Sequence, residues 1–565
     1  MHSCHCRFKK PSFLSILLSS TWCRHPSPAT LASNASGGQF FFGCALCCAL
    51  AASQCGSDQR LSCSCAVLPV ACAASCSLIV PLCCCSGFWR CVLAVSDPPT
   101  RPAMRSSLLA LLALAACLAA VSVSASSALP VLSFSPTWTV AQSSRVISLQ
   151  THIEDVANGM RLRNTGSAAA DKFIVAIPGD KSAQLAFFEA ASTDGKTKYA
   201  ARPVALNGLP SPAAAEALTN ATFFEVTLPK QIASGETIEV RLLETYTRTL
   251  RPFPESIEQN QNQLVMWSDS SMLFSPYTVQ SQDLQVMLAR DPYTKKATVE
   301  SFTKKHAKKT PDSIHYGPLA TEAAPFSRSH IQIHFVNNAP FVTFTSVSKD
   351  IEVSHWGNVA VQDNYLLTHT GAALKGEFTR ADYEQRMRGA AVAPASFRTL
   401  VADLPRTAKD VYYRDCIGNV STSHVRRPSP RDTTMHMEVD PRFPMFGGWS
   451  SDFHIGYNLP SQHYLSVDNA DPDRYVLNIS FAVPFAMSAI DHHTVRVILP
   501  EGATDIEWRT PFDIDSASFT EFKTYLDTVG RPTLILQKNN CVASKHQQNF
   551  QVSTPTASGC RVRSS

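Results

Sequence analysis

A few stretches of this sequence hold side chain types that perform chemistry in enzymes, and one of them joins serine, aspartate and histidine. Asp452 and His454 follow Ser450 and Ser451, which raises the question of a serine hydrolase. A serine nucleophile of the common hydrolase type lies in a Gly-x-Ser-x-Gly turn, and neither serine has that setting. This stretch therefore predicts no nucleophile, although a hydrolase site assembled from distant residues stays open.

Metal binding is the second chemistry to consider. His492 and His493 are adjacent, and adjacent residues of a strand point to opposite faces, so one ion cannot easily reach both. Cys44 and Cys47 have the spacing of a metal or redox pair, but neither a second ligand pair nor a βαβ context accompanies them. A His-Glu-x-x-His helix, a phosphate loop and a dinucleotide fingerprint are also missing. The sequence predicts no metal, no cofactor and no catalytic residue.

Three further polar stretches are interpreted without any catalytic or metal-binding role. His355–Asn358 (HWGN) predicts a packed turn at the end of a strand, with the aromatic ring over the glycine. Asp471 and Asp473 lie in a polar loop, where solvated charge is expected. Lys304–Lys309 (KKHAKK) predicts a solvated loop, or alternatively a patch that touches an anionic partner.

The distribution of charge argues against nucleic acid as a partner. The chain has 565 residues and a formal net charge of +5. Residues 1–103 carry that whole surplus, because the remaining chain holds 43 basic and 43 acidic side chains. Binding to phosphates requires a basic surplus on one face.

Three asparagines stand in Asn-x-Ser/Thr sequons, which accept glycans in the secretory pathway. Asn419 lies in a glycine-containing turn and is the favoured candidate. Asn220 precedes a strand. Asn478 lies within a strand, so its use requires a side chain that faces solvent.

An apparent secretory signal peptide begins at Met104 instead of at residue 1. Arg105 is followed by the apolar run Leu108–Val121 and by the small residues Ser122–Ala128, with Val123–Ala125 in the position for cleavage. We therefore expect translation to start at Met104 and the signal to span 104–125. Residues 1–103 hold 15 of the 19 cysteines and are expected to be a mis-assigned, unstructured upstream extension; a separate targeting segment is the alternative.

Beyond the signal, apolar residues alternate with a period of two, and proline and glycine bound the runs. Such a pattern predicts a mainly β fold of antiparallel sandwiches, because a parallel α/β sheet would require a long helix between strands. Only Arg380–Arg388 and Ala213–Leu218 look helical. The predicted strands are Asp171–Ile177, Phe223–Leu228, Thr237–Leu243, Ser329–Val336, Phe341–Val347 with Asp350–Val353, Tyr475–Val483, Thr494–Leu499 and Thr533–Leu536.

We expect two tandem antiparallel β-sandwich-like domains, with few short helices, over about 126–339 and 340–540. The turn cluster Asn337–Pro340 suggests the boundary. Two similar strand-and-turn motifs, Ile174–Gly179 (IVAIPG) and Val497–Gly502 (VILPEG), hint that the domains are related. Residues 541–565 are polar and Ser/Thr-rich.

Several longer motifs resemble those of the ribophorin I family, in the expected order and over about residues 143–540. They are Thr245–Pro254 (TYTRTLRPFP), Ser275–Tyr277 (SPY), Ile351–Val361 (IEVSHWGNVAV), His369–Phe378 (HTGAALKGEF), Tyr412–His424 (YYRDCIGNVSTSH), Pro441–Trp449 (PRFPMFGGW), Gly456–Pro460 (GYNLP) and Thr524–Pro532 (TYLDTVGRP).

This resemblance implies a non-catalytic subunit of the oligosaccharyltransferase complex of the endoplasmic reticulum. Its partners would be the other subunits, including the catalytic one, and nascent glycoprotein precursors, which the family's luminal part is thought to present. The resemblance also implies a single membrane helix and a cytosolic segment, and it strengthens Asn419 as a glycan acceptor.

The sequence departs from the family at three points. His424–Thr434 reads HVRRPSPRDTT where the resemblance implies an apolar strand before the PRFP motif. Cys416 stands where an acidic residue is usual. After Asn540 the resemblance is expected to end, so that a divergent tail, 541–565, replaces the membrane helix and cytosolic segment. A free secreted carbohydrate- or protein-binding sandwich is therefore the alternative from the binding class, and a secreted hydrolase that uses Asp452 or His454 is the alternative from the enzyme class.

Overall fold

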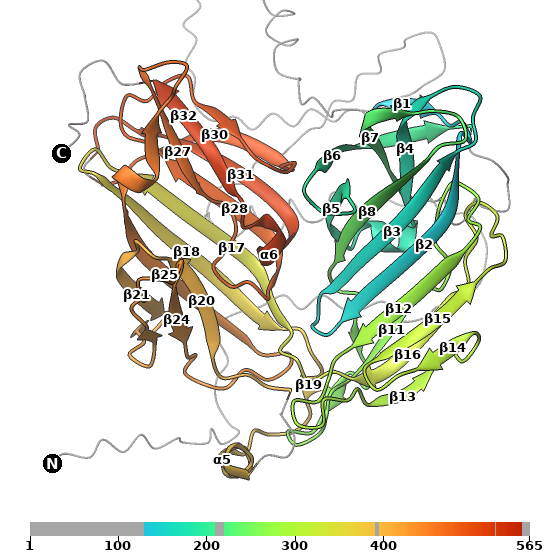
Figure 1. Ribbon diagram of the computed structural model, residues 1–565. Coiled ribbons are helices and arrows are strands. Elements are labelled where there is room, and N and C mark those ends of the chain that lie inside the picture. The colour runs from blue at the N-terminus through green and yellow to red at the C-terminus, as the bar shows by residue number, and fades with distance from the viewer. Residues whose placement is uncertain (1–128, 209–219, 390–394, 526, 556–565) are drawn as a thin grey trace, which may run out of the picture. The chain divides into compact units, whose positions relative to one another are not determined.

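The fold comes from a computed structural model, which describes residues 129–208, 220–389, 395–525 and 527–555 (Figure 1). All of them lie in one compact unit, residues 113–565. The expected signal peptide (104–125), the expected extension (1–103) and the expected helix Ala213–Leu218 lie outside the described residues, as does the end of the tail (556–565).

The described chain is mainly β, as predicted, and its helices are few and short. The helices are α3 (Gly179–Ser182), α5 (Arg380–Gly389), α6 (Ala543–His546) and the 3-10 turn η2 (Ser461–His463). The strands up to residue 340 are β1 (Val131–Ser133), β2 (Trp138–Leu149), β3 (Glu154–Asn164), β4 (Ala170–Ile177), β5 (Leu185–Ser192), β6 (Lys198–Asn207), β7 (Thr222–Ile232), β8 (Thr237–Tyr246), β9 (Arg251–Pro252), β10 (Ser256–Ile257), β11 (Leu264–Ser270), β12 (Gln282–Leu288), β13 (Val299–Phe302), β14 (Ala307–Lys309), β15 (Ser313–Leu319) and β16 (His330–Val336). The later strands are β17 (Val342–Val353), β18 (Asn358–His369), β19 (Ala373–Leu374), β20 (Leu400–Pro405), β21 (Lys409–Asp415), β22 (Gly418–Asn419), β23 (His424–Val425), β24 (Thr434–Val439), β25 (Ser450–Pro460), β26 (Leu465–Val467), β27 (Arg474–Ser480), β28 (Ala489–Ile498), β29 (Glu507–Arg509), β30 (Ser516–Phe522), β31 (Arg531–Val542) and β32 (Asn549–Pro555).

Two large sheets organise these strands. The 11-stranded sheet has the order β14-β15-β12-β2-β3-β8-β5-β6-β7-β4, with β1 added beside β6. The 8-stranded sheet has the order β22-β21-β25-β18-β17-β28-β31-β30. Apart from the short pair β10–β19, each described sheet takes its strands from only one side of residue 340. The two-domain division itself stays a prediction.

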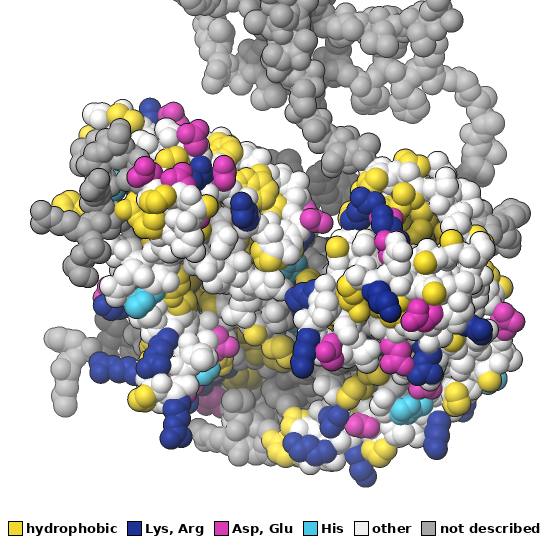
Figure 2. All heavy atoms as spheres, turned by 45° about the horizontal axis from the view of Figure 1, so that its top comes forward, with side chains coloured by type: hydrophobic (Ala, Val, Ile, Leu, Met, Phe, Trp, Pro, Cys, Tyr) yellow, Lys and Arg dark blue, Asp and Glu magenta, His cyan; other side chains and the backbone are white. Residues whose placement is uncertain are grey.

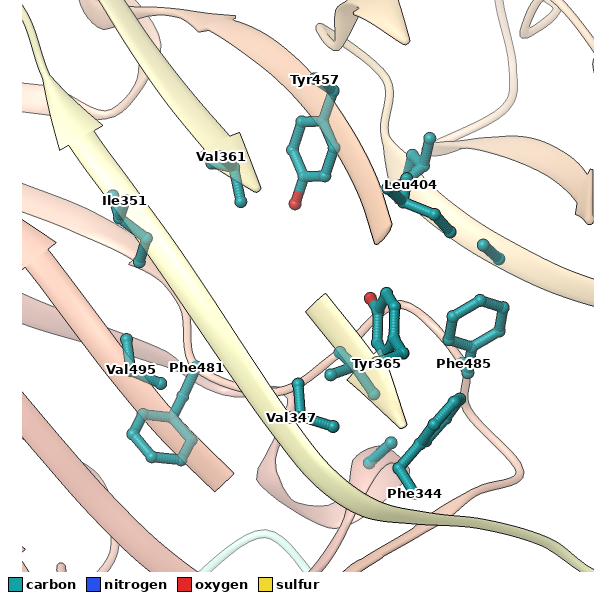
Figure 3. Close-up of a cluster of buried hydrophobic side chains, with 14 of the residues drawn as sticks. Phe344, Val347, Ile351, Val361, Tyr365, Leu404, Tyr457, Phe481, Phe485 and Val495 are labelled. Atoms are coloured by element: carbon teal, nitrogen blue, oxygen red, sulfur yellow. The ribbon is translucent and has the colours of Figure 1, made fainter. Parts of the chain in front are cut away.

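Each large sheet forms one layer of a sandwich. The 8-stranded sheet packs on the sheet β20-β24-β23 through Leu404 and Met437, and on the sheet β26-β27-β32-β29 through Ile479 and Phe550. Figure 3 shows how its side chains converge, with Phe344, Tyr365 and Phe485 grouped around one point. The centroids of the Phe344 and Tyr365 rings lie 5.0 Å apart, a distance typical of paired aromatic rings in cores.

The 11-stranded sheet buries its residues in the same manner. β2 and β12 pack on the sheet β13-β16-β11-β9, where Trp267 and Phe335 are fully buried. Further along, Phe173 of β4 and Val226 of β7 join Leu162 of β3 in a second cluster. The sheet therefore folds back on itself and covers part of its own inner face.

Four strand pairs depart from the expected antiparallel arrangement. β12 runs parallel to β2, β28 runs parallel to β17, and the short pairs β1–β6 and β10–β19 are also parallel. A parallel neighbour requires a long crossover connection. Here several β-strands, of the same sheet and of other sheets, make up each long crossover between β2 and β12 and between β17 and β28.

The two large sheets share a five-strand pattern. β15-β12-β2-β3-β8 and β31-β28-β17-β18-β25 have the same order, and each neighbouring pair has the same direction. Both β2 and β17 carry a register shift after their third residue, Val140 and Phe344. The similar motifs IVAIPG and VILPEG do not lie at equivalent positions of this five-strand pattern. Ile174–Ile177 lies in β4, whereas Val497 lies in β28, and the strand of the first sheet that corresponds to β28 is β12.

Each predicted strand overlaps an observed strand, with different ends; Tyr475–Val483, for example, runs three residues past the end of β27. Phe341–Val347 and Asp350–Val353 belong to one strand, β17, while the short run Thr533–Leu536 is the middle of β31. The predicted helix Arg380–Arg388 is confirmed as α5. β31 and β32 extend the fold beyond the predicted limit at Asn540, since Cys541 and Phe550 are fully buried.

The family-like motif PRFPMFGGW has a steric reason for one glycine. A methyl group on Gly447 would lie 1.8 Å from the carbonyl oxygen of Ala372, a backbone atom that cannot rotate away. We predict that Gly447→Ala lowers the free energy of unfolding by about 1–3 kcal/mol, the usual cost of overpacking, in a urea titration. Gly159→Ala is the matched control, because its nearest neighbour would lie 3.9 Å away. Equal stability of the two variants would contradict this account.

Candidate interaction groove

The residues considered for catalysis do not assemble into a site in the described part of the chain. Asp452 is exposed on β25, and His454, two residues later on the same face, has its ring edge-on to Tyr412 at 6.1 Å. Over the described ranges, no group of three or more His, Cys, Asp or Glu side chains is arranged to hold a metal ion.

The two adjacent histidines point to opposite faces of β28, as predicted. His492 is exposed, and its Nδ1 lies 2.7 Å from Oδ1 of Asn539. His493 is 1% exposed, and its Nε2 lies 2.9 Å from the carbonyl oxygen of Phe481. The two rings therefore have separate structural roles.

The prediction of a packed turn at His355–Asn358 is wrong. Trp356 is 95% exposed, so its ring does not cover the glycine. Gly357 has φ +83°, the left-handed conformation that glycine adopts without strain, and it turns the chain from β17 into β18. At the tip of a hairpin no neighbouring strand supplies a partner for the indole.

The charged loops are solvated, as predicted. Lys304 and Lys305 are exposed in the loop between β13 and β14, and Lys308 and Lys309 are exposed within β14 itself. Asp471 and Asp473 are exposed before β27. Figure 2 shows basic, acidic and apolar side chains interspersed on the face that it displays, without a broad area of one charge.

The three sequon asparagines are all exposed. Asn419 lies in β22, where its Oδ1 accepts a hydrogen bond of 2.7 Å from Nε of Arg414. Asn478 alternates with the buried residues Leu477 and Ile479 in β27, so its side chain faces solvent. Asn220 adopts φ +60° just before β7. Each side chain is therefore accessible to an enzyme, whereas occupancy by a glycan stays a prediction.

Both cysteines of the described chain are free. Cys416 is exposed and Cys541 is buried. Burial raises the pKa of the Cys541 thiol to about 12, which keeps it protonated and unreactive.

A buried lysine in α3, packed against the first large sheet, was missed by the sequence analysis. Lys181 Nζ lies 2.7 Å from Glu154 Oε1 and 3.1 Å from Asp269 Oδ2, and all three side chains are at most 8% exposed. Burial alone would lower the pKa of Lys181, but the attraction of Asp269 and Glu154 outweighs it and raises the pKa. Trp267 donates a further hydrogen bond of 2.8 Å to Glu154. Because the charges compensate one another, this cluster holds α3 on the sheet instead of offering a reactive group.

The second large sheet buries a lysine as well. Lys349 donates a hydrogen bond of 3.0 Å to the carbonyl oxygen of Ala482 and lies opposite Asp363 in the register of β17 and β18. Burial lowers the pKa of Lys349 and raises the pKa of Asp363, so both groups are driven toward their neutral forms. Asp363 accepts a hydrogen bond of 2.9 Å from the hydroxyl of Tyr365.

A groove with a cavity volume of about 530 Å³ lies beside β5, and its lining combines aromatic and aliphatic side chains with polar and charged groups. The Phe188 and Phe224 rings stack at 4.4 Å, and His546 lies edge-on to Phe187 at 5.9 Å and to Phe512 at 4.9 Å. Lys198 pairs with Glu189 at 2.5 Å, and Lys538 Nζ donates a hydrogen bond of 2.8 Å to the carbonyl oxygen of Asp513. The lining residues are Leu185–Ala190, Lys198, Tyr199, Ala201, Pro203, Phe224, Pro511–Asp513, Lys538, His546 and Gln548.

The edge of β5 within this groove is open. β5 pairs with β8 over its length, from Leu185 to Ser192. On its other side it pairs with β6 only at Ala190 and Ala191. No described strand pairs with Leu185–Glu189 on that side, so part of the backbone of β5 offers unpaired hydrogen-bonding groups to the groove.

The fold and the groove define a class: a layered β-sheet protein with an aromatic-lined groove bordered by a strand that is only partly paired on one side. Comparison with known sequences defines the family. The model of the Ribophorin I family matches residues 138–555, and the chain belongs to that family.

Three relatives show how far the similarity reaches. Dolichyl-diphosphooligosaccharide–protein glycosyltransferase subunit 1A of Arabidopsis thaliana is 36% identical over 418 residues, which are 72% of this chain and 64% of the relative. Subunit 1B of the same plant is 36% identical over 73% of this chain and 85% of its own length. Subunit 1 of Caenorhabditis elegans is 34% identical over 74% of this chain and 67% of its own. This chain thus spans less than two thirds of subunit 1A.

Solved structures add no argument. An M1 zinc metallopeptidase from Deinococcus radiodurans matches 45% of this chain and 53% of its own at 12% identity, with a TM-score of only 0.20.

The match corrects one boundary. We expected the resemblance to end at Asn540, but the family model continues to residue 555, the last residue of β32. Residues 541–555 therefore belong to the family's fold. Within the described ranges, no helix has the length and apolar character needed to cross a membrane.

Buried histidines predict a loss of stability in mild acid. Burial lowers the pKa of His152, His493 and His546 to about 4, whereas an unfolded histidine titrates near 6.5. A folded pKa below the unfolded one means that stability is fully present above pH 6.5 and is lost as the pH falls toward 4. Protonation of each histidine on unfolding should lower the free energy of unfolding by about 2 kcal/mol between pH 7 and pH 5.

Urea titrations at the two pH values measure this loss. We predict that His493→Gln reduces the loss by about 2 kcal/mol, since the variant removes one titrating group. His463→Gln is the control, because His463 is exposed. A loss that is the same in both variants would contradict the assignment to His493.

Proposed function

We propose that this protein is an accessory subunit of the oligosaccharyltransferase complex of the endoplasmic reticulum and supports N-linked glycosylation without performing the transfer itself. The observation that carries the proposal is membership of the ribophorin I family over residues 138–555, together with relatives whose names identify them as subunit 1 of this transferase. Its partners would be the other subunits, including the catalytic one, in the membrane of the endoplasmic reticulum.

The work of this subunit, in our proposal, is to present precursor proteins to the catalytic subunit. When a nascent chain is held beside an active site, its encounter with that site becomes intramolecular. The effective concentration of the nascent chain at the site is then roughly millimolar for a short tether. Such work requires binding surfaces and not reactive groups. The aromatic-lined groove beside β5 and the compensated state of Lys181 agree with that requirement.

Co-purification tests membership of the complex. The full chain carrying an affinity tag, expressed in eukaryotic cells and extracted in mild detergent, should retain transferase activity toward an Asn-x-Thr peptide and a lipid-linked oligosaccharide. A tagged secretory β-sandwich of unrelated sequence is the control. Recovery of the chain alone, without activity and without other subunits, would contradict the proposal and favour a free secreted binding protein.

We propose that Asn419, Asn478 and Asn220 carry glycans, with Asn419 the foremost candidate because it is exposed in a short edge strand. Asn419→Gln should remove one glycan, seen as one step of increased mobility on a denaturing gel that disappears after treatment with an endoglycosidase. Asn358→Gln, outside any sequon, is the control. An unchanged pattern in Asn419→Gln would show that this asparagine is unused.

A further inference from the structure

We propose that the groove beside β5 binds an extended polypeptide of low net charge, which adds as a strand to the open edge at Leu185–Glu189. This inference rests on the proposed function and gives it a location: the polypeptide would be a segment of a nascent precursor. It is carried by three features of the groove, namely its open backbone edge, its aromatic lining and its balanced charges.

The open edge determines the chemistry of the ligand. In an antiparallel ladder, a strand with one neighbour leaves alternate N–H and C=O groups unpaired on its free side. Leu185–Glu189 has β8 on one side and no described strand on the other. A row of alternating donors and acceptors at the spacing of a strand is complementary to another extended backbone, as in strand addition. A sugar or a small molecule would satisfy only a few of these groups.

The walls of the groove distinguish it from other edges. β30 also ends a sheet, but all seven of its residues are exposed, so a peptide added there would remain in water on both faces. At β5 the groove has a second wall, formed by Pro511–Asp513 and His546. A strand added there would bury its side chains against Phe187, Phe188 and Phe512, which supplies the apolar contact that a backbone ladder alone lacks.

The charges of the groove select for a neutral ligand. Glu189 pairs with Lys198, and the second cation, Lys538, is balanced by the carboxylate of Asp513 in the same lining, so neither sign dominates. A strongly basic or acidic segment would gain nothing here. Short apolar and hydroxyl-bearing stretches, which unfolded precursors expose, would fit.

The test uses the purified full chain and a defined probe. The probe is a fluorescein-labelled peptide of eight residues, alternating valine and threonine around one Asn-Val-Thr sequon, and its binding is followed by fluorescence anisotropy. In a series with one N-methylated residue at a time, strand addition predicts a loss of about tenfold in affinity at alternate positions and little change between them. Uniform tolerance of N-methylation would overturn the proposal.

Two matched variants locate the binding. Phe187→Asp should weaken binding at least tenfold, because a carboxylate then replaces an aromatic ring of the lining. Phe519→Asp, on the exposed edge strand β30, should leave binding unchanged. The opposite result would assign the peptide to β30 and overturn the proposal. If Phe187→Asp unfolds in a thermal melt, the N-methyl series on the unmodified chain still decides.

The outcome can be separated from that of the proposed function. If the chain co-purifies with transferase activity but N-methylation has no alternating effect, the proposed membership of the complex stands and the groove is not a peptide site. If the chain binds the peptide as predicted but purifies alone, the groove is a peptide site and the proposed membership of the complex is wrong.

Discussion

Pairing of the central strands on both sides is the constraint on which the structure depends. β2 lies between β12 and β3, and β17 lies between β28 and β18, so the long backbones of both strands are hydrogen-bonded along both edges. Since side chains alternate with a period of two, a slip of one residue would turn the buried Ile147 or Ile351 toward the opposite face. The register shift near the start of each strand fixes which residues line the core.

The same constraint explains why both sheets bury a cation at a corresponding position. Arg145 and Lys349 each lie five residues beyond the start of the register shift, at Val140 and Phe344. Arg145 bonds to the carbonyl oxygen of Ser270 and lies 3.9 Å from Asp269, while Lys349 bonds to the carbonyl oxygen of Ala482. In both cases a long side chain reaches across the sandwich to a backbone group of the other layer. A buried donor without a hydrogen-bond partner would lower the free energy of unfolding, so these contacts stabilise the packing of one layer on the other.

The sequence could predict the class of fold but not its topology. Runs such as Thr237–Leu243 show clear alternation, and they are strands. β3 and β25 escaped notice because Asn158 with Gly159, and Gly456 with Asn458, interrupt the β-branched pattern that marks a strand. Parallel pairing of β12 with β2 depends on residues about 140 positions apart, and no local pattern encodes that distance. Lys181 looked like a surface residue, because Glu154 and Asp269 become its neighbours only in the folded sheet.

The open edge of β5 was equally invisible in the sequence, because an edge is defined by a strand that is not there. Exposed edges favour aggregation, and proteins usually shorten, charge or cover them. At β5 the edge lies in a groove instead: Phe188 stacks on Phe224, and Pro511–Asp513 also lines the groove, so the proposed ligand is a single extended segment and not a second folded molecule. In the function that we propose, a groove of this kind would reconcile two demands. It must offer backbone groups to many sequences, and it must not pair with copies of itself.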